Sequence, residues 1–190
     1  MLASVHTMLA PQTANIPWLI TLIYKVFTNG LLGGFAIGGN GLRIGDDALR
    51  QLTYLAFGVI CILVFLLWII RSIRKYGRKS VNIWSASAFM ILSYYLFAVG
   101  VHENHIFMAF AIILCIPQHI EAVKVYILLS VGLFLHLFTS WGLGRSFQKF
   151  SDATHLSLTY YSMATLVVLA LYIYAFSIIG KLPKLKSLRV

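Results

Sequence analysis

Long apolar runs separated by short polar segments dominate this chain. Residues 52–70 form the first convincing run, nineteen residues without a charged side chain. As a helix rising about 1.5 Å per residue, this run approaches the roughly 30 Å of a bilayer's hydrocarbon core. The pattern predicts an all-α integral membrane protein with five transmembrane helices, preceded by a short re-entrant or interfacial helix. The other four expected spans are residues 81–101, 106–117 (or on to 120), 125–143 and 158–179.

The first fifty residues differ from the rest. Residues 16–27 are apolar and aromatic but carry Lys25, and Pro17 lies where proline suits the first turn of a helix. Such a helix covers only about 18 Å and does not cross a bilayer. Six glycines between positions 30 and 41 favour a plain loop over a phosphate cradle, since no Gly-Lys-Ser/Thr follows. We therefore expect an external segment with a Gly-rich loop in 1–50 and a five-helix transmembrane domain in 51–190.

Composition agrees with a membrane protein. Hydrophobic residues make up 60% of the chain and charged residues 11%, with a mean hydropathy of +0.87. A soluble domain is about half apolar and a quarter charged. The net charge of +10 is compatible with nucleic-acid binding. However, the basic residues cluster at the ends of the apolar runs, which is a topology signal, so we expect no nucleic-acid partner.

The basic residues predict the orientation. Five of them lie within residues 71–79, and Lys124 and the C-terminal tail add five more on the same side. The opposite side receives the remaining five of the fifteen, so the positive-inside rule makes the tail cytoplasmic and His102 external. No Asn-x-Ser/Thr sequon occurs, which fits a prokaryotic plasma membrane. Interfacial aromatic belts would account for Trp18, Trp84 and Trp141.

A charged cluster interrupts two apolar runs in the segment Gly100-Val101-His102-Glu103-Asn104-His105-Ile106-Phe107. Ionisable groups in such a position are by default a functional-site hypothesis. The alternative is a short external turn whose polar residues face water. The run that follows supplies only about 18–22 Å of helix. It therefore either continues through Pro117 with a kink or begins below the external surface, and we expect the second, with the cluster in a recess.

Two kinds of chemistry fit this cluster. Zinc proteases need His-Glu-x-x-His, but here the histidines are three apart and no third ligand is evident, so we expect no metal and no cofactor. Lipid phosphate fits better, because a helix N-terminus and a histidine both donate to anions. Glu103 could orient His102 or bind a sugar hydroxyl, and His105 lies close by in the sequence. Arg145 could bind phosphate bidentately, or only lie at the interface. In the middle of the fourth run, His136 is expected to face the interior and bond a neighbouring helix.

Two segments carry a family resemblance. Residues 94–107, which read Tyr-Tyr-Leu-Phe-Ala-Val-Gly-Val-His-Glu-Asn-His-Ile-Phe, resemble the (V/R)HE-(N/K/R)-(H/Y)-(L/I) stretch of the GT-C superfamily of polytopic, polyprenyl-phosphate-sugar-dependent glycosyltransferases. Thr13-Ala14-Asn15-Ile16-Pro17-Trp18 is similar to their Ser/Thr-Ala-Asn-x-x-Trp segment, found one helix pair earlier. In those families a His-Glu pair opens a late transmembrane helix on the non-cytoplasmic side.

The resemblance implies transfer of a hexose from a polyprenyl-phosphate donor on the non-cytoplasmic face, as in mannosyl- and glucosyltransferases. It points to His102 and Glu103, whereas Asn104 and His105 occupy its variable positions. It covers only the C-terminal part of such an enzyme, and Asp46 and Asp47 do not match the catalytic carboxylate of the first external loop. We therefore expect donor-lipid binding without turnover unless an N-terminal half or partner subunit is present. The competing hypothesis is a non-catalytic membrane subunit or a lipid-phosphate-binding or transport protein.

Overall fold

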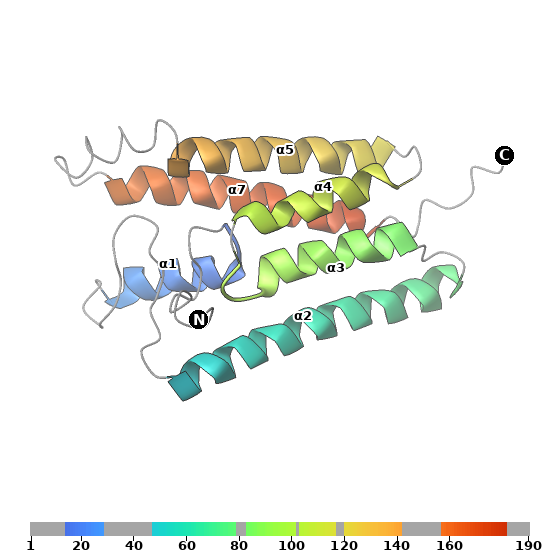
Figure 1. Ribbon diagram of the computed structural model, residues 1–190, viewed down its shortest axis with the longest axis horizontal. Coiled ribbons are helices and arrows are strands. Elements are labelled where there is room, and N and C mark those ends of the chain that lie inside the picture. The colour runs from blue at the N-terminus through green and yellow to red at the C-terminus, as the bar shows by residue number, and fades with distance from the viewer. Residues whose placement is uncertain are drawn as a thin grey trace.

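The computed structural model describes residues 14–28, 47–78, 83–101, 103–116, 120–141 and 157–181. Every regular element in these ranges is helical, so the all-α prediction is confirmed there. In chain order the helices are α1 (Ile16–Thr28), α2 (Asp47–Tyr76), α3 (Ile83–Phe97), the 3₁₀ helix η3 (Glu103–Ile106), α4 (Phe107–Leu114), α5 (Ile120–Trp141) and α7 (Ser157–Ile179) (Figure 1).

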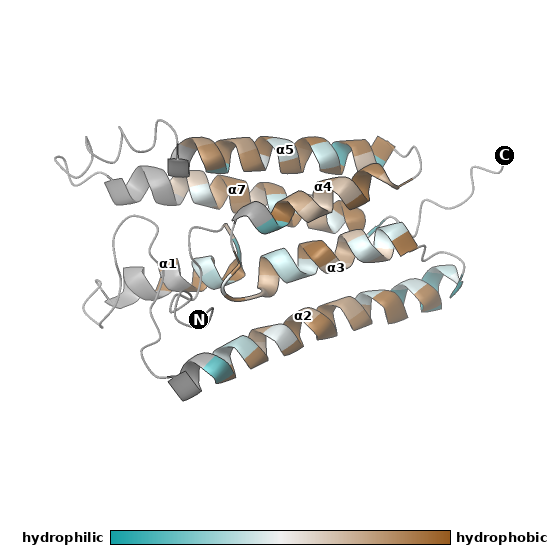
Figure 2. Cartoon of the chain, in the orientation of Figure 1, coloured by the Kyte–Doolittle hydropathy of each residue, from teal (hydrophilic) through white to brown (hydrophobic). Residues whose placement is uncertain are grey.

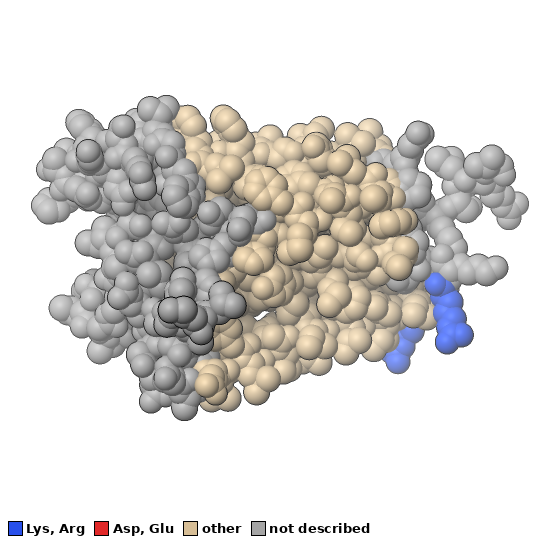
Figure 3. Space-filling view, viewed as in Figure 1, with Lys and Arg blue, Asp and Glu red and all other residues tan. Residues whose placement is uncertain are grey.

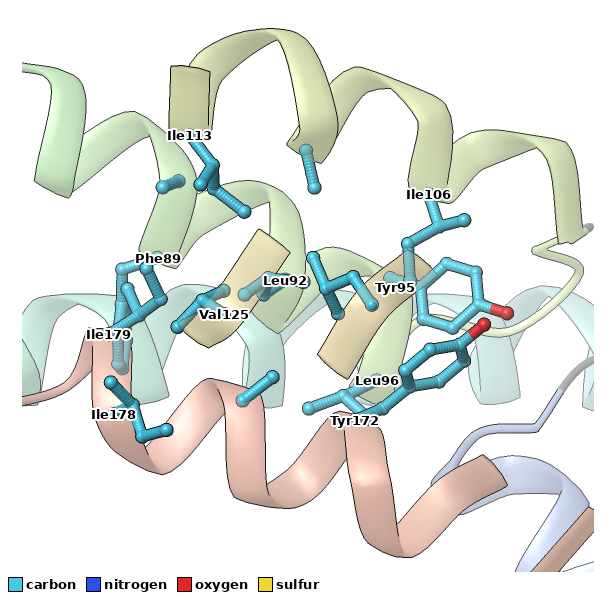
Figure 4. Close-up of a cluster of buried hydrophobic side chains, with 14 of the residues drawn as sticks. Phe89, Leu92, Tyr95, Leu96, Ile106, Ile113, Val125, Tyr172, Ile178 and Ile179 are labelled. Carbon is cyan, nitrogen blue, oxygen red and sulfur yellow. The ribbon is translucent and has the colours of Figure 1, made fainter. Parts of the chain in front are cut away.

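The helices pack as a bundle built around α3, α5 and α7. The antiparallel pair of α5 and α7 makes the most extensive contact, and α3 packs against α7, α4 and α2 (Figure 1). The interior is formed by buried side chains that these helices direct at one another (Figure 4). Fully buried members of this core are Leu92 and Leu96 of α3, Val125 and Leu129 of α5, and Val168 and Tyr172 of α7.

Helix α2 lies at the edge of the bundle, packed against α3, and Trp68 is its most deeply anchored aromatic side chain. The indole of Trp68 stacks on Phe89 of α3, with ring centroids 4.4 Å apart and an interplanar angle of 10°. The same indole donates a hydrogen bond from Nε1 to the carbonyl oxygen of Gly180, at 3.0 Å. The rest of α2 remains largely uncovered, since only 11% of its most apolar stretch is buried. Figure 2 shows hydrophobic residues along its middle and hydrophilic residues near both ends.

Two of the described helices are long and apolar enough to cross a membrane. They are Gln51–Tyr76, which contains the first expected span, and Ile120–Phe138. The other predicted spans are shorter as helices. The second is limited to the fifteen residues of α3, about 22 Å, and the apolar stretch Met163–Ile179 of α7 covers only about 26 Å. The described helices therefore do not support five full spans.

The third predicted span is reduced to the eight residues of α4, about 12 Å of helix. It ends at Leu114, where the N–H groups of Cys115 and Ile116 bond to the carbonyls of Ile112 and Ile113. A kinked helix continuing through Pro117 is therefore wrong. The physical reason is that a proline disfavours α conformation in the residue before it and has no N–H to donate.

The fourth predicted span begins earlier than expected. Because α5 starts at Ile120, Glu121 and Lys124 belong to its first turns and not to a connecting loop. Lys124 Nζ donates to Glu121 Oε1 at 2.8 Å, so the two charges pair three residues apart on the helix surface. This local pair lets the helix include two charged residues at its start.

Candidate functional site

The residues between α3 and α4 reverse the chain inside the bundle. Figure 1 shows this turn set back from the end of the bundle, while α1, α5 and α7 continue past it. Its backbone passes through Val101 and Ile106, which are both 0% exposed. Buried residues therefore flank the His-Glu segment on either side, and the part of the turn that the structure describes is not a loop projecting from the surface.

Glycine 100 allows the chain to turn this sharply. Its φ is +71°, in the left-handed region that other residues rarely adopt. A Cβ at this position would lie 2.6 Å from the hydroxyl oxygen of Tyr54, which belongs to α2. Val99 is buried against Tyr54 and Phe57. Helix α2 therefore packs closely against one side of the turn, and both the backbone and the space require glycine.

Asparagine 15 holds the turn from the other side. Its Oδ1 accepts a hydrogen bond from the backbone N–H of Trp18 at 2.9 Å, which caps the N-terminus of α1. Its Nδ2 donates to the carbonyl oxygen of Ala98 at 3.3 Å, across 83 positions of sequence. Asn15 is fully buried and Trp18 is 6% exposed. One side chain thus starts α1 and attaches it to the turn.

The predicted site residues are described to different extents. His102 and Arg145 lie outside the described residues, and of Glu103 only the backbone, within η3, is described. His105 is partly buried, and its ring packs edge-on against Tyr94 with centroids 6.1 Å apart. The roles of these four residues therefore stay predictions. What the structure adds is the surroundings of the segment that carries them.

Buried polar side chains lie within the same bundle. The rings of Tyr95 and Tyr172 pack edge to face at 5.4 Å, and both are at most 1% exposed. Figure 4 shows their hydroxyls side by side, pointing toward the end of the bundle where α1 enters. Gly132 makes room for them, because a Cβ there would lie 2.5 Å from Cε1 of Tyr172. His136, one turn along α5, is 1% exposed, which confirms its predicted interior position.

Reasoning from the sequence missed several of these residues. Asn15 was part of a resembling segment but was not a candidate, although Asn before Ile-Pro-Trp is a typical helix cap. Tyr172 and Gly132 gave no signal, since a tyrosine and a glycine in apolar runs have many uses. Trp18, expected in an interfacial belt, is buried instead, next to Asn15, whose bond to Ala98 attaches the start of α1 to the bundle.

No metal centre is evident among the described residues, where no three His, Cys, Asp or Glu side chains gather closely enough to hold an ion. The free thiols of Cys61 and Cys115 lie apart, one buried and one exposed. Comparisons of the chain with known protein families, with curated proteins and with solved structures found no match. The functional hypothesis therefore depends on the residues and geometry of the chain itself.

Proposed function

We propose that this chain is an integral protein of a prokaryotic plasma membrane. The outer side of α2 supports this, because Leu55, Ile62 and Leu67 are 55–64% exposed. Fully covering such a side chain with apolar surroundings is worth about 1.5–3 kcal/mol. In Figure 3 the visible described surface is free of charge except for lysine and arginine side chains at the end where α2 finishes. That end is the cytoplasmic one in the proposed orientation.

Within the membrane, the five predicted passes are unequal. We propose that α2, α5 and α7 extend toward both faces, whereas α3 and α4 fall short of the external face. The lengths of α3 and α4, about 22 Å and 12 Å, support this arrangement. The His-Glu segment would then lie at the bottom of an external recess, beside the start of α1.

In this recess we place the phosphate of a polyprenyl-phosphate sugar donor. The observation that carries the proposal is the hydrogen bond from Asn15 to Ala98, since it joins the two segments that resemble glycosyltransferases. Segments that belong to one binding site are expected to lie together in the fold, and these two are 83 residues apart in the sequence. The resemblance of either segment alone would support a donor site less strongly.

The proposed roles follow from the chemistry of the side chains. His102 donates a hydrogen bond to the donor phosphate, and Glu103 either holds the imidazole in the required tautomer or binds a sugar hydroxyl. His105 and Arg145 assist from the edge of the site, with the guanidinium matching phosphate oxygens. The chain is the transmembrane part of a hexosyltransferase, and a partner subunit or N-terminal half supplies the catalytic carboxylate.

A non-catalytic lipid-phosphate-binding or transport protein is the second candidate. The carboxylates expected on the external side are Glu103, Asp46, Asp47 and Asp152. None follows a first transmembrane span as the catalytic acid of the resembling enzymes does. Both candidates bind the donor lipid, and only the first transfers its sugar when the partner is present.

Photo-crosslinking to a polyprenyl-phosphate probe tests the proposal. Loss of a hydrogen bond to a charged group costs about 1.5–3 kcal/mol, which corresponds to an affinity loss of about 10- to 150-fold for His102→Ala. His105→Ala is the matched control, with a smaller loss expected. Equal labelling of the wild type and His102→Ala would favour the alternative interpretation, in which the cluster is a solvated turn that binds no lipid phosphate. Labelling without sugar transfer in the presence of the missing spans would favour the second candidate.

A further inference from the structure

A groove runs along α2 at the end of the bundle farthest from the His-Glu turn. It is shallow and open, and it is lined by Leu67, Ile70, Arg71, Arg74 and Lys75, all from α2. Their spacing places all five along one side of α2, over about 12 Å of helix. The two apolar residues come first, and the three cations follow toward the helix end.

The cations of this groove are available to an anion. Within the described residues, neither Arg71 nor Arg74 pairs with a carboxylate, and both are exposed. Lys75 Nζ lies 5.6 Å from the ring centroid of Tyr76, a contact that leaves its positive charge unneutralised. Arg71 and Arg74 lie about one turn apart on α2, and guanidinium groups match the oxygens of a phosphate.

The apolar lining indicates which phosphate compound fits. Leu67 and Ile70 are 64% and 46% exposed, and the apolar surface continues along the helix through Leu63 and Leu66. A free phosphate ion would make no use of this surface, whereas the acyl chains of a lipid would cover it. Toward the C-terminal end of α2, the apolar side chains are followed by the cations. From the centre of a bilayer to its surface, acyl chains are followed by phosphates in the same order.

The side of α2 that faces away from the groove is anchored to the bundle. Trp68, next to Leu67 in sequence, is 8% exposed, stacked on Phe89 and hydrogen-bonded to Gly180. This anchor fixes the rotation of α2 about its axis, so the stripe of groove residues keeps facing outward. The backbone that carries the groove residues is therefore held against the bundle.

We propose that this groove binds the headgroup of an anionic phospholipid of the cytoplasmic leaflet. Arg71 and Arg74 contact the phosphodiester, Lys75 adds charge, and the acyl chains lie on Leu67 and Ile70. The inference depends on the proposed membrane location of α2 but not on sugar transfer. It describes a second lipid site, on the opposite side of the membrane from the donor site.

Native mass spectrometry of the full chain released from detergent tests the site, with phosphatidylglycerol and phosphatidylcholine of identical acyl chains as probes. We expect preferential retention of phosphatidylglycerol. The variant Arg71→Gln/Arg74→Gln should reduce it about 30-fold, at about 1 kcal/mol per basic residue. The charge-matched control, Lys184→Gln/Lys186→Gln in the C-terminal tail, should retain the lipid. Arg71→Lys/Arg74→Lys, which keeps the charge, should lose less than the glutamine pair.

Three outcomes would overturn the inference. One is equal retention of the two lipids, and another is an equal loss in the groove variant and the tail control. The third is displacement of phosphatidylglycerol by equimolar inorganic phosphate together with no effect of Leu67→Ser, which would indicate a simple anion site. Binding of the polyprenyl-phosphate probe should be unchanged in the arginine variants, so failure here is distinct from failure of the donor site.

Discussion

Substituting Asn15 should loosen the connection between α1 and the His-Glu turn. The side chain makes two bonds, one capping α1 through Trp18 and one reaching the carbonyl of Ala98, and it is 0% exposed. Asn15→Ser retains an oxygen that can cap the helix but is too short to reach Ala98. Asn15→Ala loses both bonds. The pair of variants therefore separates the long-range bond from the cap.

The magnitudes follow from the two bonds. Leaving the Ala98 carbonyl without its partner costs about 1–3 kcal/mol, because Ala98 is only 7% exposed. Losing the cap costs about 1 kcal/mol more. For a chain of this size about 1 kcal/mol shifts Tm by roughly 2–4 °C. We expect Asn15→Ser to lower Tm by about 2–12 °C, and Asn15→Ala by a further 2–4 °C.

The assay is thermal unfolding of the purified chain in detergent. Ser177→Ala is the control, because it removes an exposed side-chain hydrogen bond to the Tyr174 carbonyl and should leave Tm nearly unchanged. If Asn15→Ser melts with the wild type and only Asn15→Ala is destabilised, the cap alone matters. The long-range bond would then contribute nothing, and the reason for placing both resembling segments in one site would be lost.

Three further predictions concern the turn, the bundle interior and the orientation. Gly100→Ala should destabilise the chain more than Gly77→Ala in the same melting assay, since both have positive φ but only Gly100 faces Tyr54, and Tyr54→Phe should restore part of the loss. Gly132→Ala should lower Tm by forcing Tyr172 aside, whereas Gly58→Ala, with nothing within 4 Å, should raise the free energy of unfolding by about 0.5–1 kcal/mol. Equal effects of the two substitutions would refute the close packing of α5 on α7. In a background with Cys115→Ser, a membrane-impermeant thiol reagent added outside should label a cysteine placed at Asn104 and spare one at Ser80; the reverse pattern would invert the proposed topology.

The helices were predictable because their signals are local. Pro17 in the first turn of α1 and an aspartate at the start of α2 follow the preferences of helix N-termini, and both helices begin there. Hydrophobicity alone overestimated α3 and α4. Apolar residues continue beyond the helix ends at Phe97 and Leu114, but Gly100 turns the chain and Pro117 prevents continuation.

The surroundings of the candidate site were not predictable, since they depend on contacts between distant residues. The motif around His102 is visible in the sequence, but the bond between Asn15 and Ala98 joins residues that no local pattern connects. Likewise, the position of the Tyr172 ring requires that Gly132 of the neighbouring helix α5 has no side chain. Such complementarity is a property of the packed bundle and has no signature in one sequence.

Mapping the attachment points of a photoreactive polyprenyl-phosphate probe tests the proposed donor site most directly. The probe carries its reactive group beside the phosphate, and the labelled peptides are identified by mass spectrometry. We expect two peptides from distant parts of the chain to be labelled, one containing residues 14–18 and one containing residues 98–106. Labelling spread along the exposed side of α2, with neither of these peptides modified, would contradict a lipid-phosphate site formed by α1 and the His-Glu turn.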